Sequence, residues 1–178
     1  LAGTAAAQQY PTKPLRLVVP FAPGGPNDIL GRLVAQNLTQ QLGQNVVVEN
    51  RGGAGGTIGL EYTARLPGDG YSVAMGGSSN LAVAASLYQK LSYDPLRDFT
   101  PIINVAHVPY AIAVNPTVPA KNVKELIAIA KTKSGYLSYG SSGPGSMSNL
   151  AAELLKSMAG AEIVHVSYKG TAPALMDV

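Results

Sequence analysis

Five short loops, most of them rich in glycine and serine, each separate an apolar run that predicts a strand from a pattern that predicts a helix. They occupy residues 21–26, 51–56, 76–79, 141–146 and 168–171. At the start of a helix, backbone N–H groups are unpaired and a partial positive charge develops. Glycine lets a ligand approach the backbone closely, and serine and asparagine side chains add hydrogen-bond donors. The loops therefore indicate a site for a small anion with carboxylate groups.

Tight binding of such an anion requires several of these loops to converge. One helix N-terminus contributes about 0.3–1 kcal/mol to the binding of an exposed anion, whereas micromolar affinity requires about 8 kcal/mol. A single loop of this kind can simply be a tight connection between a strand and a helix. Several in series favour a shared site, formed where two domains close over the ligand.

Signatures of catalysis and of cofactor binding are weak. Residues 51–56 lack the Gly-Lys-Ser/Thr of a P-loop, and no loop has the G-x-G-x-x-G dinucleotide pattern. Residues 140–143 miss the G-x-S-x-G nucleophile elbow by one position. The chain has no cysteine and two histidines, His107 and His165, without the spacing of a zinc site. We therefore expect no metal, no cofactor and no enzyme activity.

Four polar residues in or between these loops each allow more than one interpretation. Asp28, beside a helix start, is more simply a charge favoured by the helix dipole than an acid–base group. Lys169 could pair with a ligand carboxylate or be a solvated loop lysine. His107 and His165 lie in apolar patterns that predict strands, so we interpret both as core or edge histidines with satisfied hydrogen bonds.

The overall composition is that of a folded globular protein. Of 178 residues, 46% are hydrophobic and 13% are charged, and the formal net charge is +3. The basic residues are scattered, which argues against nucleic-acid binding. No apolar run is long enough to span a bilayer. The small residues at the N-terminus resemble the end of a signal peptide, so we expect residues 1–9 to be its remnant and the protein to be periplasmic.

Strand and helix patterns alternate along the chain. Strands are predicted at residues 15–20, 46–49, 71–75, 137–140 and 162–166, and strand patterns also dominate residues 101–114. Helices are predicted at residues 27–42, 58–65, 81–87, 122–133 and 146–158, with a last helix from Thr171. This alternation predicts an α/β fold with mainly parallel sheets.

The rhythm of the pattern changes between residues 94 and 101, which predicts a crossing from one domain to another. We therefore expect domain 1 to occupy residues 10–100 and domain 2 residues 101–178. The last helical pattern stops abruptly at Val178, so we expect domain 2 to be incomplete.

Five longer runs of sequence together resemble one family. They are YPTKPLRLVVPFAPGG at residues 10–25, VVVENRGGAGG at 46–56, PGDGY at 67–71, YGSSG at 139–143 and VSYKGTAPA at 166–174. In combination they are similar to the Bug (TctC-like) solute-binding proteins of tripartite tricarboxylate transporters. The resemblance extends from Tyr10 to Val178 and so covers nearly the whole chain.

The resemblance implies a type II periplasmic-binding-protein fold, a Venus flytrap of two α/β domains. It implies a small carboxylate ligand, namely a dicarboxylate, tricarboxylate, acidic amino acid or aromatic acid, held between the domains by backbone groups and water. The implied partner is a membrane permease of two subunits, and we expect the receptor to be a monomer. The family has two pincer loops, which correspond here to residues 21–28 (the first) and 141–149 (the second). These loops and neighbouring segments would bind the ligand through Phe21, Ala22, Pro23, Gly24, Gly25, Asn27, Asp28, Ser78, Ser141, Ser142, Gly143, Ser146, Asn149, Tyr168, Lys169, Gly170 and Ala172.

The sequence departs from the family pattern at Ser146 and Asn149, where members often have threonine and histidine. Asn149 can donate a hydrogen bond but carries no charge, which leaves the ligand preference open. Two other functions remain as alternatives. One is a ligand-sensing input protein for a membrane sensor kinase, and the less favoured one is a serine enzyme with His107 or His165 as its base.

Overall fold

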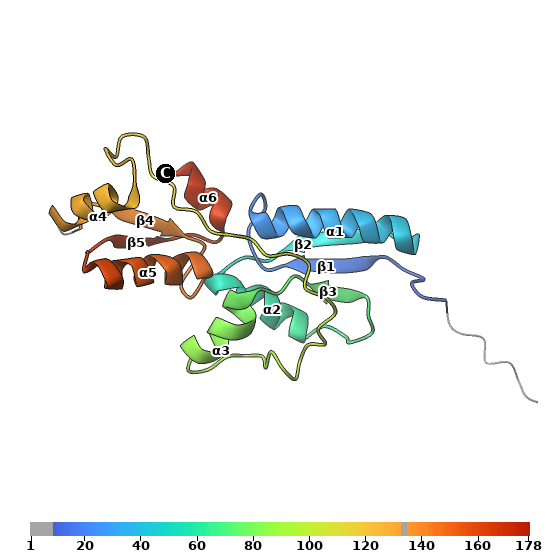
Figure 1. Ribbon diagram of the computed structural model, residues 1–178. Coiled ribbons are helices and arrows are strands. Elements are labelled where there is room, and N and C mark those ends of the chain that lie inside the picture. The colour runs from blue at the N-terminus through green and yellow to red at the C-terminus, as the bar shows by residue number, and fades with distance from the viewer. Residues whose placement is uncertain (1–8, 133–134) are drawn as a thin grey trace, which may run out of the picture.

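The computed structural model describes residues 9–132 and 135–178, which form two lobes placed end to end (Figure 1). In the first lobe, β1 (Leu15–Val19), β2 (Val46–Asn50) and β3 (Ser72–Ala74) form a parallel sheet in the order β2-β1-β3. In the second lobe, β4 (Ser138–Ser141) and β5 (Val164–Ser167) pair in parallel. The predicted α/β fold with parallel strands is confirmed.

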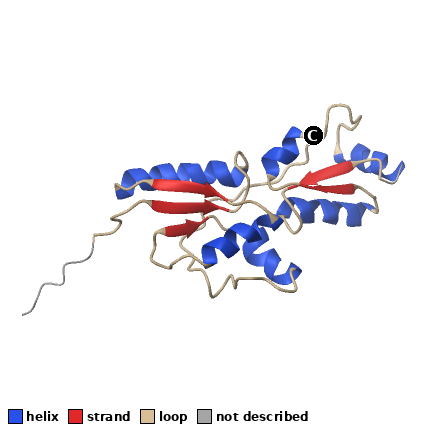
Figure 2. Ribbon diagram, turned by 180° about the vertical axis from the view of Figure 1, so that it is seen from behind, coloured by secondary structure: helices blue, strands red, loops and turns tan. Residues whose placement is uncertain are grey.

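Helices cover both faces of each sheet. They are α1 (Pro26–Leu42), α2 (Thr57–Ala64), α3 (Ala84–Leu87), α4 (Val123–Thr132), α5 (Met147–Ala159) and α6 (Thr171–Met176), with a 3₁₀ turn η1 (Ala54–Gly56) and a π-helical turn η2 (Ser79–Val83). Helices α1 and α2 lie on opposite faces of the first sheet (Figure 2). Among the described residues, no helix is both long and apolar enough to cross a membrane.

Small residues of α1 contact the first sheet. The apolar pattern of this helix predicts one face with Ile29, Leu30, Leu33, Val34 and Leu38, and Val34 and Leu38 do pack against the core. Ile29 and Leu33 are more than half exposed, so for them the prediction is wrong. Asp28, Gly31 and Ala35 are buried instead. A methyl group at Gly31 would lie 2.7 Å from Cγ2 of Val19, so the helix axis runs too close to the strand for a larger side chain. The core beneath it consists of Leu15, Leu17, Ala35 and Val46.

The sequence Asn122-Val123-Lys124-Glu125 predicts a capping box at the start of α4, and the structure has one. The backbone N–H of Glu125 donates to Oδ1 of Asn122 at 3.0 Å, and the Glu125 carboxylate accepts from the backbone N–H of Lys121 at 2.7 Å. The first bond satisfies one N–H group that the helix start leaves unpaired, and the second fixes the residue just before the cap.

The strands predicted in residues 101–114 are wrong. The structure gives this segment no strand, and its side chains are exposed throughout. A strand forms only where a neighbouring chain pairs with its backbone, and neither described sheet extends to this segment. His107 is correspondingly exposed, with only a contact to Asn104 at 3.3 Å, so its interpretation as a core or edge histidine is also wrong.

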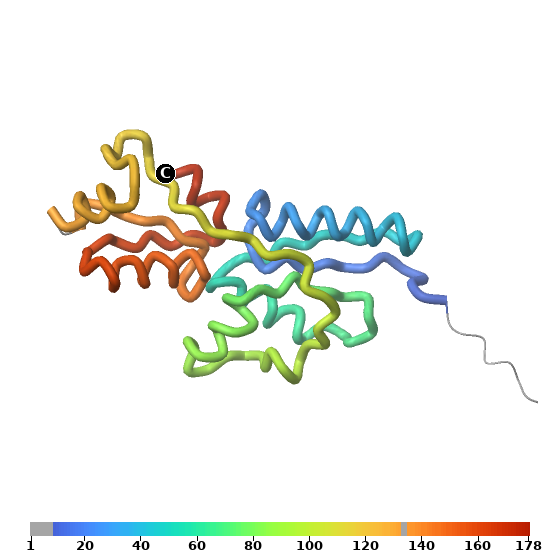
Figure 3. The backbone as a smooth tube through the Cα atoms, in the orientation of Figure 1, coloured from blue at the N-terminus to red at the C-terminus, as the bar shows by residue number. Residues whose placement is uncertain are grey.

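The two lobes point the carboxyl ends of their strands at each other. The strands of both sheets run toward the middle of the molecule, where the loops that follow them meet (Figures 1 and 2). The backbone tube shows the segment after residue 100 passing along this junction from the first lobe to the second (Figure 3). In parallel α/β sheets, ligands bind at this end of the strands.

We predict that Gly31→Ala destabilises the protein. Alanine favours helix by up to about 1 kcal/mol over glycine, but forcing its methyl group against Val19 costs about 1–3 kcal/mol through overpacking. Equilibrium unfolding in urea would give the change. Gly68→Ala is the matched control because no atom lies within 4 Å of its added methyl group. A Gly31→Ala variant as stable as the wild type would show that α1 does not press on the sheet.

Candidate functional site

The predicted loops meet at the junction of the two lobes. The backbone N–H of Ala22, after β1, donates to the carbonyl oxygen of Lys169, after β5, at 3.3 Å. A methyl group at Gly24 would lie 3.5 Å from Cβ of Ala172, so the start of α1 also faces the start of α6. Two of the loops predicted from the sequence to converge are therefore in direct contact.

Glycine is required where backbones of the two lobes come closest. A methyl group at Gly52 would lie 2.7 Å from the carbonyl oxygen of Lys169 and 2.9 Å from the backbone nitrogen of Ala22. At Gly55, whose φ is +63°, it would lie 2.8 Å from the carbonyl oxygen of Pro144. Backbone atoms cannot move aside as a flexible side chain can. The loop after β2 thus packs against both loops of the second lobe.

The buried side chain of Asp28 fixes the first pincer loop by hydrogen bonds. Its carboxylate accepts from the backbone N–H of Gly24 at 2.9 Å, from Nδ2 of Asn50 at 2.9 Å and from Nε of Arg32 at 3.0 Å. Burial alone would raise the pKa of this carboxyl, but these hydrogen bonds outweigh it and hold the pKa below its ordinary value. Both oxygens have partners within the first lobe, so Asp28 shapes the loop that would face a ligand.

Serine hydroxyls cluster in the second pincer loop. Ser141, Ser142 and Ser146 are buried. Ser146 caps α5 by accepting from the backbone N–H of Asn149 at 3.2 Å. Oγ of Ser148 lies 3.2 Å from that of Ser142 and 3.0 Å from that of Ser146. Ser148 was not among the predicted site residues, although its place in the same small-residue run could have indicated it.

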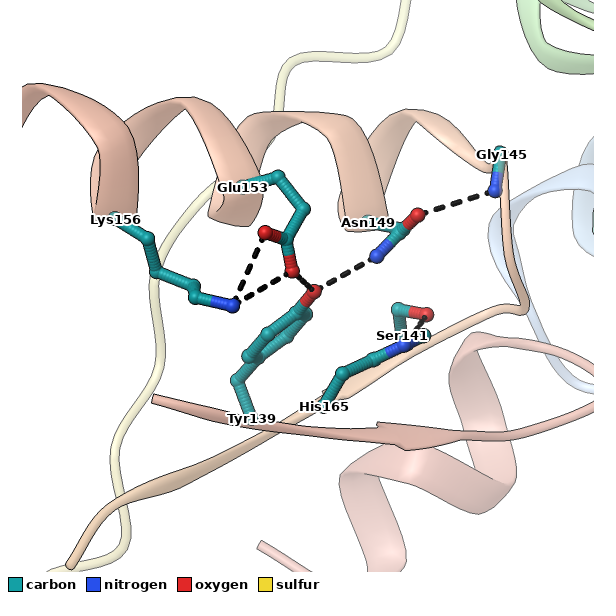
Figure 4. A network of polar contacts seen from close by, with 7 residues as sticks. All are labelled: Tyr139, Ser141, Gly145, Asn149, Glu153, Lys156 and His165. Atoms are coloured by element: carbon teal, nitrogen blue, oxygen red, sulfur yellow. Dashed lines mark hydrogen bonds and ion pairs between the residues drawn. The ribbon is translucent and has the colours of Figure 1, made fainter. Parts of the chain in front are cut away.

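Asn149 is engaged at both ends of its amide (Figure 4). Its Nδ2 donates to the hydroxyl of Tyr139 at 2.7 Å, and its Oδ1 accepts from the backbone N–H of Gly145 at 3.1 Å. The sequence suggested that this side chain donates to a ligand. The structure instead uses it to tie the loop to β4 and α5.

Ser141 and His165 form a pair with the spacing of a nucleophile and its base. Nε2 of the histidine lies 2.7 Å from Oγ of the serine. However, Ser141 is 1% exposed, and its oxygen already accepts from the backbone N–H of Gly143 at 3.1 Å. No acidic side chain of the described residues hydrogen bonds the other ring nitrogen. The hydrogen bond from Ser141 therefore satisfies one ring nitrogen of His165, a partly buried histidine on an edge strand, as predicted.

The remaining predicted residues are placed unevenly. Phe21, Gly25 and Gly170 are buried at the junction, whereas Pro23, Gly24, Ser78 and Lys169 are exposed. Ala22, Asn27, Tyr168 and Ala172 are partly buried, and the hydroxyl of Tyr168 donates to the carboxylate of Asp177 at 2.7 Å. The junction gathers the residues after β1, β4 and β5, and the Ser78 side chain is exposed.

Asn80 is a site candidate that the sequence did not single out from its neighbour Ser78. Its side chain is fully buried, its Oδ1 accepts from the backbone N–H of Gly77 at 2.9 Å, and its Nδ2 has no partner among the described residues. This nitrogen faces Gly56 and Phe21 at the carboxyl end of β1, within 2.4 Å of where a Gly56 methyl group would be. Because a buried donor is normally hydrogen-bonded, this N–H group is a candidate partner for a water or a ligand oxygen.

The described residues contain no group of three or more histidines and acidic residues that could hold a metal ion. The polar groups described above at the junction are backbone N–H groups, serine hydroxyls and the Asn80 amide, which are donors suited to an anion with oxygen atoms.

Known proteins are similar to this chain in sequence and in fold. The sequence model described as "Tripartite tricarboxylate transporter family receptor" matches residues 30–178. Protein BugT of Bordetella pertussis is 38% identical over 100% of this chain and 55% of its own length. The chain spans about half the length of the curated relatives it matches.

Solved structures agree with the sequence matches. The R. palustris protein Rpa4515, solved with adipate, is 42% identical and superposes with a TM-score of 0.90 over 94% of this chain and 56% of that one. The periplasmic binding protein BugD is 37% identical, with a TM-score of 0.84 over the same shares. These matches confirm the fold that the resemblance implied. The chain belongs to the receptor family of the tripartite tricarboxylate transporters, a family of solute-binding receptors and not of enzymes.

Proposed function

We propose that the protein is a periplasmic receptor that captures a small carboxylate between its two lobes and delivers it to a tripartite tricarboxylate transporter. The observation that carries this proposal is the meeting of loops from both sheets at facing carboxyl ends, with Ala22 and Lys169 in direct contact. The adipate in Rpa4515, which shares 42% of its residues with this chain over the aligned region, supports the ligand class.

The ligand carboxylate is proposed to lie against the start of α5, among the hydroxyls of Ser142, Ser146 and Ser148, with Nδ2 of Asn80 as a donor from the first lobe. A helix N-terminus and its serine cap attract negative charge through aligned N–H dipoles. Four or five hydrogen bonds to a charged acceptor, at about 1.5–3 kcal/mol each, bring the total into the range that micromolar binding requires.

The proposed domains are residues 10–100 and 101–178, each with one of the two described sheets. The proposed partners are the carboxylate and the membrane permease subunits, and the receptor acts as a monomer without a cofactor. Export by a cleaved signal peptide is part of the proposal, and residues 1–8 of the expected remnant lie outside the described residues.

Binding of adipate tests the ligand class. We expect isothermal titration calorimetry of the purified protein to give a dissociation constant in the micromolar range or below, because both lobes contribute donors. Adipamide, the uncharged diamide of the same length, is the matched control and should not bind measurably. Equal binding of adipate and adipamide would contradict a carboxylate site, and binding of neither would exclude a linear dicarboxylate of this length.

The second pincer loop is tested by the double variant Ser142→Ala plus Asn149→Ala. It removes one hydroxyl of the cluster and the amide that fixes Gly145. We expect adipate affinity to fall roughly tenfold or more, a loss of about 1.4 kcal/mol. The circular dichroism spectrum should stay that of the wild type, and thermal unfolding should stay cooperative. Affinity equal to that of the wild type would place the ligand elsewhere.

A further inference from the structure

A relay of hydrogen bonds leads from the outer part of α5 to the second pincer loop (Figure 4). Lys156 donates to both carboxylate oxygens of Glu153 at 3.0 Å. The hydroxyl of Tyr139, on β4, donates to Oε1 of Glu153 at 2.5 Å and accepts from Nδ2 of Asn149 at 2.7 Å. Oδ1 of Asn149 then accepts from the backbone N–H of Gly145 at 3.1 Å.

The ionised carboxylate of Glu153 determines which group donates in every hydrogen bond of this relay. An ionised carboxylate can only accept, so the single hydrogen of the Tyr139 hydroxyl must point at Glu153. The phenolic oxygen is then left as an acceptor for Asn149, which must offer its NH₂ group. The amide oxygen therefore faces Gly145. With the amide reversed, the NH₂ group would meet the Gly145 N–H, donor against donor.

The surroundings keep the two outer groups in these protonation states. Hydrogen bonds from Tyr139 and Lys156 lower the pKa of Glu153 below its ordinary value. Burial raises the pKa of Tyr139, and its bond to the carboxylate raises it further. The ring of His165, the register partner of Tyr139 on β5, stacks on it with centroids 4.8 Å apart and so limits its movement. At neutral pH, Tyr139 stays a donor and Glu153 an acceptor.

We propose that Glu153 is a positioning residue that sets the orientation of the Asn149 amide through Tyr139, and thereby fixes Gly145 in the second pincer loop. Glu153 follows Asn149 by four residues on α5, so both lie on one face of the helix, one turn apart. The relay itself stands on the geometry alone. Its effect on ligand affinity rests on the proposed function.

Amide hydrogen exchange at Gly145, followed by NMR, tests the relay without any ligand. In Glu153→Met, no oxygen remains to accept the Tyr139 hydrogen, which then turns toward Asn149 and opposes its NH₂ group. We expect Gly145 to exchange roughly tenfold faster or more in this variant and in Tyr139→Phe, because the local opening becomes more favourable. Lys156→Met removes the cation but leaves the acceptor, and it should exchange nearly as the wild type does.

The Val164 amide, which donates to the carbonyl oxygen of Leu137 at 2.9 Å, reports whether the second lobe remains folded in each variant. Glu153→Met with Val164 protected and Gly145 exchange unchanged would overturn the proposal. An unprotected Gly145 amide in the wild type would overturn it as well, because the bond from Gly145 to Asn149 would then not be formed in solution.

A double-mutant cycle with adipate connects the relay to ligand binding. If Glu153 acts through Asn149, then adding Glu153→Met to Asn149→Ala should leave the dissociation constant unchanged, although Glu153→Met alone weakens binding. Additive losses would show that Glu153 acts by another route. Should the wild type fail to bind adipate, the proposed function loses this support, while the exchange rates still decide whether the relay exists.

Discussion

The structure depends on one close approach of backbones, between the loop after β1 in the first lobe and the loop after β5 in the second. Ala22 donates to the carbonyl oxygen of Lys169, and Gly52 lies against both groups with no room for a methyl group. This contact places the carboxyl ends of two separate sheets face to face. Apart from Lys169, whose side chain is exposed, the donors proposed for this junction are backbone N–H groups, serine hydroxyls and the Asn80 amide, so a captured anion would be held by dipoles.

Two polar side chains, one buried and one partly buried, fix the conformation of the junction loops. Asp28 in the first lobe and Asn149 in the second each accept a hydrogen bond from the N–H of a loop glycine, Gly24 and Gly145 respectively. Loops rich in glycine lose much conformational entropy on folding. Holding them in place before the ligand arrives reduces the entropy that binding must overcome. In the proposed function, both residues would therefore contribute to binding without having to contact the ligand.

Much of the fold could be predicted, because apolar runs and helical periodicity report local structure directly. The strands before the pincer loops, the helices after them and the capping box of α4 were found in this way, and the family could be identified from its motifs. The strands predicted in residues 101–114 were wrong, since an apolar pattern does not say whether a neighbouring strand is present to pair with it. Within the site, the pattern could not separate Ser78 from Asn80, nor show that Asn149 bonds to Tyr139, because both depend on tertiary contacts.

The closing of the two lobes at this junction is tested most directly by a disulfide across it. The chain has no cysteine, and a methyl group at Gly25 would lie 3.9 Å from Cβ of Thr171, within the range that a disulfide spans. The measurement is adipate binding to the double variant Gly25→Cys and Thr171→Cys, oxidised and then reduced. We expect the oxidised protein, locked shut before ligand is added, to bind little adipate, and dithiothreitol to restore binding. Equal binding in both states, or failure of the two cysteines to pair, would contradict closure of the lobes through this contact.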